Sequence, residues 1–197
     1  MFGTEEINLN LPDSEIFYYP NFFSLTESNA YFNTILNNTT WQQDDITVFA
    51  KTYPQPRLTA LFSDNEKPYS YSNITMHPIP FSDCLLEIKH KIEKKFKTEF
   101  TTCLANLYRS GQDSNGWHAD NEKELGINPI IASVSLGESR LFNLKHRTKK
   151  ELKQKLLLEN GSLLLMKGET QHNWLHQIPK TKREIKPRIN LTFRVIK

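Results

Sequence analysis

A histidine and an aspartate two residues apart, His118 and Asp120, are the side chains of this chain best suited to chemistry. In an extended segment, residues i and i+2 lie on one face, so the imidazole and the carboxylate would point the same way. A second histidine would complete a 2-His-1-carboxylate facial triad, which binds Fe(II) and leaves positions open for a co-substrate and dioxygen. Because a His-x-Asp pair often arises by chance, a metal site is inferred only if other residues of the chain also indicate one.

The last predicted strand, residues 188–196, has a polar face and an apolar face. The polar face carries Arg188, Asn190, Thr192 and Arg194. Two arginines cannot face an apolar core, because each buried cation would need a partner. This face is therefore either exposed to solvent or lines a cavity that receives an anion. Arginine binds a carboxylate through a bidentate fork, and the nearby His-x-Asp pair favours a pocket for a dicarboxylate.

Asn106 and Tyr108 repeat this pattern upstream of the His-x-Asp pair. Their amide and phenol would share a strand face and supply neutral donors to the same anion. The alternative interpretation is a polar pair on a half-exposed strand.

The third metal ligand would be one of five other histidines: His77, His90, His146, His172 and His176. His90 and His146 lie in lysine-rich segments and are expected to be solvated, and His77 precedes a proline turn. His172 and His176 both follow an apolar strand at 162–166. They are an even number of residues apart, so spacing alone does not choose between them.

The elements that must position these residues are short strands. From residue 101 onward they are separated by glycine, asparagine and proline, and are expected at 103–108, 116–120, 130–136, 140–145, 161–167, 172–178 and 188–196. This pattern predicts a mainly β fold with flanking helices (α+β), a jelly roll. The basic residues between 145 and 160 indicate either a basic helix or a long charged loop.

The first hundred residues are expected to hold two helices and several strands. A capping box at Ser24–Glu27 begins the first helix, and a second begins near Ser82 with a solvated lysine face. A strand is expected at 17–19, and two more at 46–50 and 58–62 around a turn at 53–56. We expect one domain over 1–197, with helices and hairpins in 1–100 and the catalytic core in 101–197.

Composition excludes several classes of protein. The 197 residues carry a net charge of only +3 and two cysteines, so no disulfide framework or cysteine metal site is expected. The N-terminus lacks the pattern of a signal peptide, and no stretch is apolar enough to span a membrane. We expect a soluble intracellular monomer, cytoplasmic in a bacterium and nuclear or cytoplasmic in a eukaryote.

Several segments together resemble the AlkB family of Fe(II)/2-oxoglutarate-dependent dioxygenases. They are Asn106-Leu107-Tyr108, His118-Ala119-Asp120, His176 and 187–194, with further similarity at 56–60, 129–135 and 161–164. The resemblance runs from about residue 41 to the C-terminus in order and spacing. It is nearest to the small eukaryotic-type homologues that remove alkyl groups from nucleic-acid bases.

This resemblance implies a double-stranded β-helix fold, with Fe(II), 2-oxoglutarate and O2 as cofactor and co-substrates. It implies that His176 is the third ligand, and leaves His172 packed or solvated. It implies that Arg188 pairs with the distal carboxylate of 2-oxoglutarate, helped by Tyr108 and Asn190. Asn106 and Arg194 would contact the end that chelates iron, and Thr192 would belong to the same co-substrate set.

The implied reaction is oxidative demethylation of 1-methyladenine and 3-methylcytosine in DNA, with RNA left open. Decarboxylation of 2-oxoglutarate yields succinate, and hydroxylation of the N-alkyl carbon releases formaldehyde. A base must leave the duplex stack to reach a buried iron. By the same resemblance it would lie between His118 and the tyrosines Tyr69 and Tyr71, whose other interpretation is packing on the sheet.

Two further substrate contacts are implied. Glu122 would accept a hydrogen bond from the exocyclic amine of the damaged base, and Arg57 would lie near the base or its backbone. Apart from the resemblance, Lys180, Lys182 and Arg183 form a basic loop between His176 and Arg188 that could hold phosphates, although a solvated loop is nearly as good an interpretation.

Phe49, within 48–50, would be an apolar finger that fills the gap left by a flipped base, unless it packs in the core. Asn121 and Leu136 differ from the residues common in relatives, which affects the expected base preference and not the metal. The alternatives are the same chemistry on RNA only, on a protein or on a small molecule, and a non-catalytic nucleic-acid-binding relative.

Overall fold

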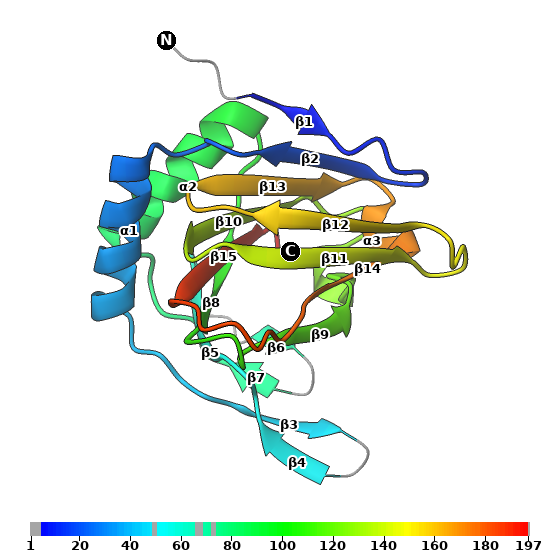
Figure 1. The fold of residues 1–197 in the computed structure, drawn as a ribbon. Helices are drawn as coiled ribbons and strands as arrows, with labels where there is room; N and C mark the ends of the chain where they lie inside the picture. The colour runs from blue at the N-terminus through cyan, green and yellow to red at the C-terminus, as the bar shows by residue number, and fades with distance from the viewer. Residues whose placement is uncertain (1–4, 49–50, 66–68, 72–73, 197) are drawn as a thin grey trace.

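The computed structural model describes residues 5–48, 51–65, 69–71 and 74–196. Two antiparallel sheets form its framework (Figure 1). In order across the larger sheet, the strands are β1 (Ile7–Asn8), β2 (Glu15–Tyr19), β13 (Ser162–Lys167), β10 (Ile131–Gly137), β15 (Arg188–Arg194), β8 (Thr102–Tyr108) and β5 (Leu58–Ser63). The smaller sheet consists of β12 (Lys153–Leu158), β11 (Arg140–His146), β14 (Trp174–Ile178) and β9 (Asn115–His118).

The two faces of the larger sheet are covered differently. One face packs on the helices α1 (Leu25–Asn38) and α2 (Asp83–Phe96), in a cluster that includes Leu136, Leu163 and Phe193. The other faces the smaller sheet across a second cluster with Phe142 and Trp174. Inward and outward side chains alternate along each strand, which is what two packed antiparallel sheets require. The predicted jelly roll with outer helices is confirmed.

Local sequence determines where the helices begin. The Ser24 hydroxyl accepts a hydrogen bond from the Glu27 backbone N–H, and the Glu27 carboxylate accepts one from the Ser24 N–H, as the capping box predicts. Ser82 caps α2 in the same way through the Leu85 N–H. Lys89, which the spacing allowed on either face of this helix, is buried and pairs with Asp64 and Glu93. No helix of the described chain is long and apolar enough to span a membrane.

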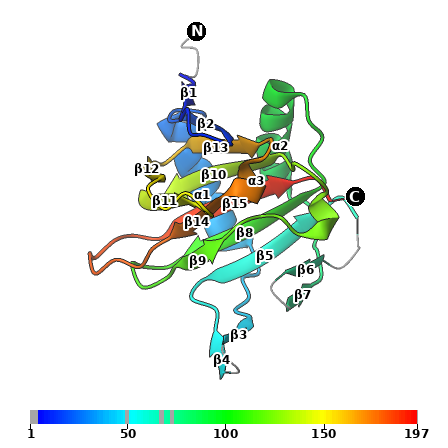
Figure 2. The same ribbon diagram turned by 90° about the vertical axis from the view of Figure 1, so that its right-hand side faces the viewer.

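Two small hairpins project beside the sandwich, next to β5 (Figures 1 and 2). They are β3 (Asp45–Val48) with β4 (Lys51–Pro54), and β6 (Tyr69–Tyr71) with β7 (Ile74–Met76). The predicted turn at 53–56 is therefore wrong in part, because Tyr53 and Pro54 pair with β3. Phe49 lies outside the described residues.

The segment 145–160 is neither of the two alternatives expected for it. It forms the end of β11 and the whole of β12, which pair from Arg140–Leu158 to Lys145–Lys153. Charged side chains hide the strand pattern, because they occupy its outward positions and leave Leu158 buried. His146 was expected to be solvated, but it is buried, with Nε2 3.2 Å from Asp13 Oδ2 and its ring against Trp174.

Candidate active site

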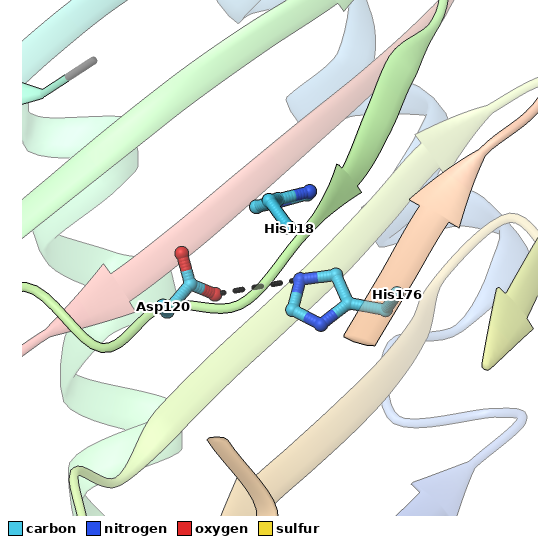
Figure 3. A group of neighbouring side chains, drawn as sticks. All are labelled: His118, Asp120 and His176. Carbon is cyan, nitrogen blue, oxygen red and sulfur yellow. Dashed lines mark ion pairs between the residues drawn. The ribbon is translucent and has the colours of Figure 1, made fainter. Parts of the chain in front are cut away.

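The structure brings His118, Asp120 and His176 together inside the sandwich (Figure 3). His118 ends β9 and pairs in register with His176 on the adjacent strand β14. Asp120 lies two residues beyond the end of β9 and is directed toward the same point. The potential ligand atoms all lie within 4.8 Å of one another, and His176 Nε2 is 3.7 Å from Asp120 Oδ2.

The protonation states of these three groups suit a metal. Burial lowers the pKa of His176 to about 3, with repulsion from His118 as a further cause. Burial also lowers the pKa of His118. For Asp120, burial alone would raise the pKa, but nearby positive charge, that of Arg194 foremost, outweighs it and the pKa lies below its usual value. Two neutral imidazoles and a carboxylate are the forms that coordinate a divalent cation.

Backbone contacts orient the first ligand. His118 Nδ1 is 2.8 Å from the Gly116 carbonyl, so the ring proton belongs on Nδ1 and Nε2 carries the lone pair. Asn115 Nδ2 lies 3.2 Å from that Nε2. The His176 ring is stacked on Phe142, with centroids 5.1 Å apart. Both imidazoles are therefore held in place before any metal binds.

The polar face of β15 lines a cavity, which decides between the two interpretations that the sequence left open. Its arginines, Asn190 and Thr192 are buried and pair across to β8, with Arg188 opposite Tyr108 and Asn190 opposite Asn106. The cavity contains the three potential metal ligands and this polar face together. Its lining includes Arg57, Asn106, Tyr108, Asn115, His118, Asp120, His176, Arg188, Asn190, Thr192 and Arg194.

Arg188 is the group in this cavity that most clearly needs a ligand. It is 1% exposed, and its Nη2 donates to Ser135 Oγ at 2.8 Å. Its Nε and Nη1 have no hydrogen-bond partner among the described residues. Burial lowers its pKa to about 10, so it stays charged at neutral pH. A buried cation left unpaired is costly, and a carboxylate would satisfy both nitrogens.

The second arginine of the face has a different role. The Arg194 guanidinium forms a buried ion pair with the Asp120 carboxylate. The Asp120 backbone N–H also donates to Gln171 Oε1 at 2.9 Å, and Gln171 is fully buried. These contacts fix the carboxylate between the two histidines and the end of β15.

A chain of hydrogen bonds links the polar residues of neighbouring strands along the cavity wall. Arg57 Nε donates to Asn106 Oδ1 at 2.8 Å, and Asn106 Nδ2 donates to Asn190 Oδ1 at 3.2 Å. Asn190 Nδ2 then donates to Ser133 Oγ at 2.8 Å. Arg57 Nη1 also donates to Asn115 Oδ1 at 3.1 Å. Arg57 thus joins the polar face to the strand that carries His118.

The remaining predicted substrate residues lie outside this buried face. Glu122 precedes a short 3-10 helix at Lys123–Leu125, and its Oε2 is buried without a hydrogen-bond partner among the described residues. Burial raises its pKa. Lys182 and Arg183 are exposed on the loop after β14. The backbone of Tyr69 and Tyr71 forms β6, but their side chains fall outside the described part of the chain, as does Phe49.

Sequence reasoning missed Arg140, which no local pattern distinguishes from a surface arginine. It is buried, and its guanidinium donates to the Ser110 carbonyl at 3.2 Å, the Asp113 carbonyl at 2.9 Å and the Pro179 carbonyl at 2.7 Å. It also lies 5.6 Å from the centre of the Tyr108 ring. One side chain thus joins the loop that leads into β9 to the loop that leaves β14.

Comparison with known proteins agrees with this geometry. A sequence profile of the 2OG-Fe(II) oxygenase superfamily matches residues 15–194. Alpha-ketoglutarate-dependent dioxygenase alkB homolog 3 of Bos taurus is 40% identical over 98% of this chain and 71% of its own length. DNA oxidative demethylase ALKBH2 of Arabidopsis thaliana is 35% identical over 93% of this chain and 67% of its own length. This chain belongs to the AlkB family.

The AlkB fold extends to a distant relative. The solved structure of OsALKBH1 covers 97% of this chain with a TM-score of 0.64 at 16% identity. As an AlkB-family 2OG-Fe(II) oxygenase, the protein is a dioxygenase that uses Fe(II), 2-oxoglutarate and O2. The neutral histidines and the ionised aspartate fit the metal, and Arg188, whose Nε and Nη1 lack hydrogen-bond partners among the described residues, fits the dicarboxylate.

Replacing Arg140 tests whether its hydrogen bonds hold together the loop before β9 and the loop after β14. We expect Arg140→Met to lower the free energy of unfolding by about 3 kcal/mol, because three carbonyls lose a charged donor. Trypsin should also cleave faster after Lys182 and Arg183. Urea denaturation and timed proteolysis measure these effects, with Arg147→Met on the exposed surface as the control. Equal stability and equal cleavage in the two variants would show that other contacts hold the loops.

Proposed function

We propose that this protein removes alkyl groups oxidatively from nucleic-acid bases, with 1-methyladenine and 3-methylcytosine in DNA as the expected substrates. The observation that carries the proposal is a buried facial triad beside a buried arginine whose Nε and Nη1 lack partners among the described residues. The relatives with DNA oxidative demethylase in their names share 35% of aligned residues with this chain, which supports a nucleic-acid substrate.

His118, Asp120 and His176 would hold Fe(II). Arg188 would bind the distal carboxylate of 2-oxoglutarate with Tyr108 and Asn190, while Asn106, Thr192 and Arg194 would contact the end nearer the metal. When bound, Fe(II), 2-oxoglutarate and O2 supply the oxidation that converts an N-methyl group to a hydroxymethyl group, which is then lost as formaldehyde.

The protein's own residues would orient the metal ligands and exclude water from the cavity. Arg194 pairs with the Asp120 carboxylate, Gln171 accepts a hydrogen bond from the Asp120 backbone N–H, and Phe142 supports the His176 ring. None of these side chains has to act as a nucleophile or base in this scheme. Because the polar groups are buried, their interactions with a bound dicarboxylate would be stronger than in water.

The damaged base would leave its stack to reach the metal. We infer that it lies against His118 and the β6 tyrosines, Tyr69 and Tyr71, with Arg57 nearby. Glu122 is suited to the exocyclic nitrogen, because its buried Oε2 lacks a partner among the described residues. 1-Methyladenine and 3-methylcytosine are cationic, because the methyl group is on a ring nitrogen, so they would also favour the ionised state of this carboxyl group.

Contacts to the rest of the nucleic acid would come from the surface around the cavity. Lys182 and Arg183 are exposed on the loop tethered by Arg140, where they could bind phosphates. The apolar finger proposed at Phe49 would fill the gap that a flipped base leaves in a duplex.

Formaldehyde release from methylated oligonucleotides is the direct assay. We expect release with 1-methyladenine and 3-methylcytosine that depends on both Fe(II) and 2-oxoglutarate. His118→Ala, Asp120→Ala and His176→Ala should each abolish it and weaken Mn(II) binding, because two ligands are too few to hold the ion. His172→Ala is the matched control and should be active.

Other results of this assay would contradict parts of the proposal. Full turnover by a triad variant would exclude the metal assignment. Turnover of 2-oxoglutarate stimulated by peptides or small molecules, and not by methylated DNA or RNA, would exclude the nucleic-acid substrate. If the protein binds DNA but does not bind iron or 2-oxoglutarate, it is a non-catalytic relative of the family.

Replacing Arg188 separates ligand binding from folding. We expect Arg188→Met to weaken 2-oxoglutarate binding to the Mn(II)-loaded protein by roughly 100-fold, about 2.7 kcal/mol, because a charge-assisted pair is lost. The ligand-free variant should unfold at the same temperature as the wild type or higher, since an unpaired buried cation is removed. Calorimetric titration and thermal unfolding measure the two effects, with exposed Arg183→Met as the control. Unchanged affinity would exclude Arg188 from the co-substrate site.

A further inference from the structure

The outer face of the smaller sheet is not covered by either long helix. The helices α1 and α2 pack on the larger sheet, on the side away from β11, β12 and β14 (Figure 1). Along these strands the inward side chains are buried, while the outward ones are exposed or half-buried. This face therefore presents its outward residues to solvent.

The charge on this face is of one sign. The four strands β9, β11, β12 and β14 contain no aspartate or glutamate, and their outward positions include Lys145, Lys153 and Lys155. Lys145 and Lys153 lie directly opposite each other in the β11–β12 register. Like charges in this arrangement are destabilising. No carboxylate forms an ion pair with any of the three within the described ranges.

An exposed aromatic side chain lies beside these lysines. Trp117 precedes the metal-ligand candidate His118 on the edge strand β9, and its side chain points outward where that of His118 points inward. It is 40% exposed, and Lys145 Nζ lies 4.2 Å from the centre of its ring. A cation and an aromatic ring on the outside of the strand that carries a metal ligand suit a nucleic-acid strand, which offers phosphates and base faces together.

The need to protect an edge strand from pairing with another chain does not explain all of these lysines. Lysine on an edge strand prevents pairing with another chain, and β12 is such a strand. Lys145, however, lies on β11, which is between β12 and β14. The positive charge thus continues across the sheet toward Trp117 and the cavity.

We propose that Trp117, Lys145, Lys153 and Lys155, here called the lysine face, bind the strand of nucleic acid whose target base enters the cavity. The lysines pair with phosphates outside the target nucleotide, and Trp117 stacks on an unpaired base next to it. This inference rests on the proposed function and adds the path of the strand over the protein. It requires that affinity increases with strand length beyond the nucleotides inside the cavity.

The test compares two charge-matched double variants. Lys153→Gln/Lys155→Gln changes the lysine face, and Lys94→Gln/Lys97→Gln removes the same charge from two exposed positions at the C-terminal end of α2, the second of them the residue that caps the helix. Binding of a methylated single strand of about 20 nucleotides, longer than one small domain covers, is measured by fluorescence anisotropy against salt concentration. Binding of 2-oxoglutarate to each Mn(II)-loaded variant checks that its site is intact.

We expect the lysine-face variant to bind the long strand roughly tenfold more weakly than the wild type. Its plot of log affinity against log salt should be shallower by about 1.4, because each phosphate contact to a single strand contributes about 0.7. The α2 variant should match the wild type in both measurements. Trp117→Ala should weaken binding at least fivefold without changing the salt slope, since stacking is not ionic.

Two results would overturn the inference. If the lysine-face and α2 variants behave alike, the lysines act only through net charge or as edge protection. If a trinucleotide binds the wild type as tightly as the long strand does, no contact outside the cavity contributes. A wild-type protein that binds no nucleic acid would instead overturn the proposed function along with this inference.

Discussion

The ion pair between Asp120 and Arg194 joins the two sheets at the point where chemistry is expected. Asp120 follows β9 of the smaller sheet, and Arg194 ends β15 of the larger one. Both side chains are buried, and a buried charge that loses its partner is strongly destabilising. The pair therefore fixes the metal-ligand candidates against the polar face of β15. The side-chain oxygen of Gln171 accepts a hydrogen bond from the Asp120 backbone N–H and so holds the main chain of the same residue.

Much of this site follows from the alternation of side chains along strands. That period predicted one polar face for 188–194, and the structure buries it. Spacing could not separate His172 from His176. In the structure His176 is buried beside Asp120, while His172 lies exposed on the short helix α3 (Thr170–Asn173). Arg140 and Gln171 were not predicted, because their partners are backbone groups distant in sequence. The strand β12 was missed because charged outward side chains and an unbroken run of leucines obscured its alternation.

The same alternation separates two chemical environments on one strand. On β9, His118 faces a cavity of buried polar groups, while Trp117 faces solvent beside Lys145. Inside, Arg188 retains two nitrogens without partners in the described part of the chain, so the cavity is organised for an anion before one binds. Outside, the uncompensated lysines are suited to a polyanion. The family relationship assigns the oxygenase chemistry. Under the proposed function, the cavity would receive the target base and the outer surface would bind the rest of the nucleic acid.

A crystal structure of the protein with Mn(II) and 2-oxoglutarate tests the central claim most directly, with anomalous scattering used to locate the metal. The account predicts one strong anomalous peak coordinated by His118, Asp120 and His176, and a carboxylate of 2-oxoglutarate paired with the Arg188 guanidinium. A metal bound by other residues, or 2-oxoglutarate bound without contact to Arg188, would contradict it.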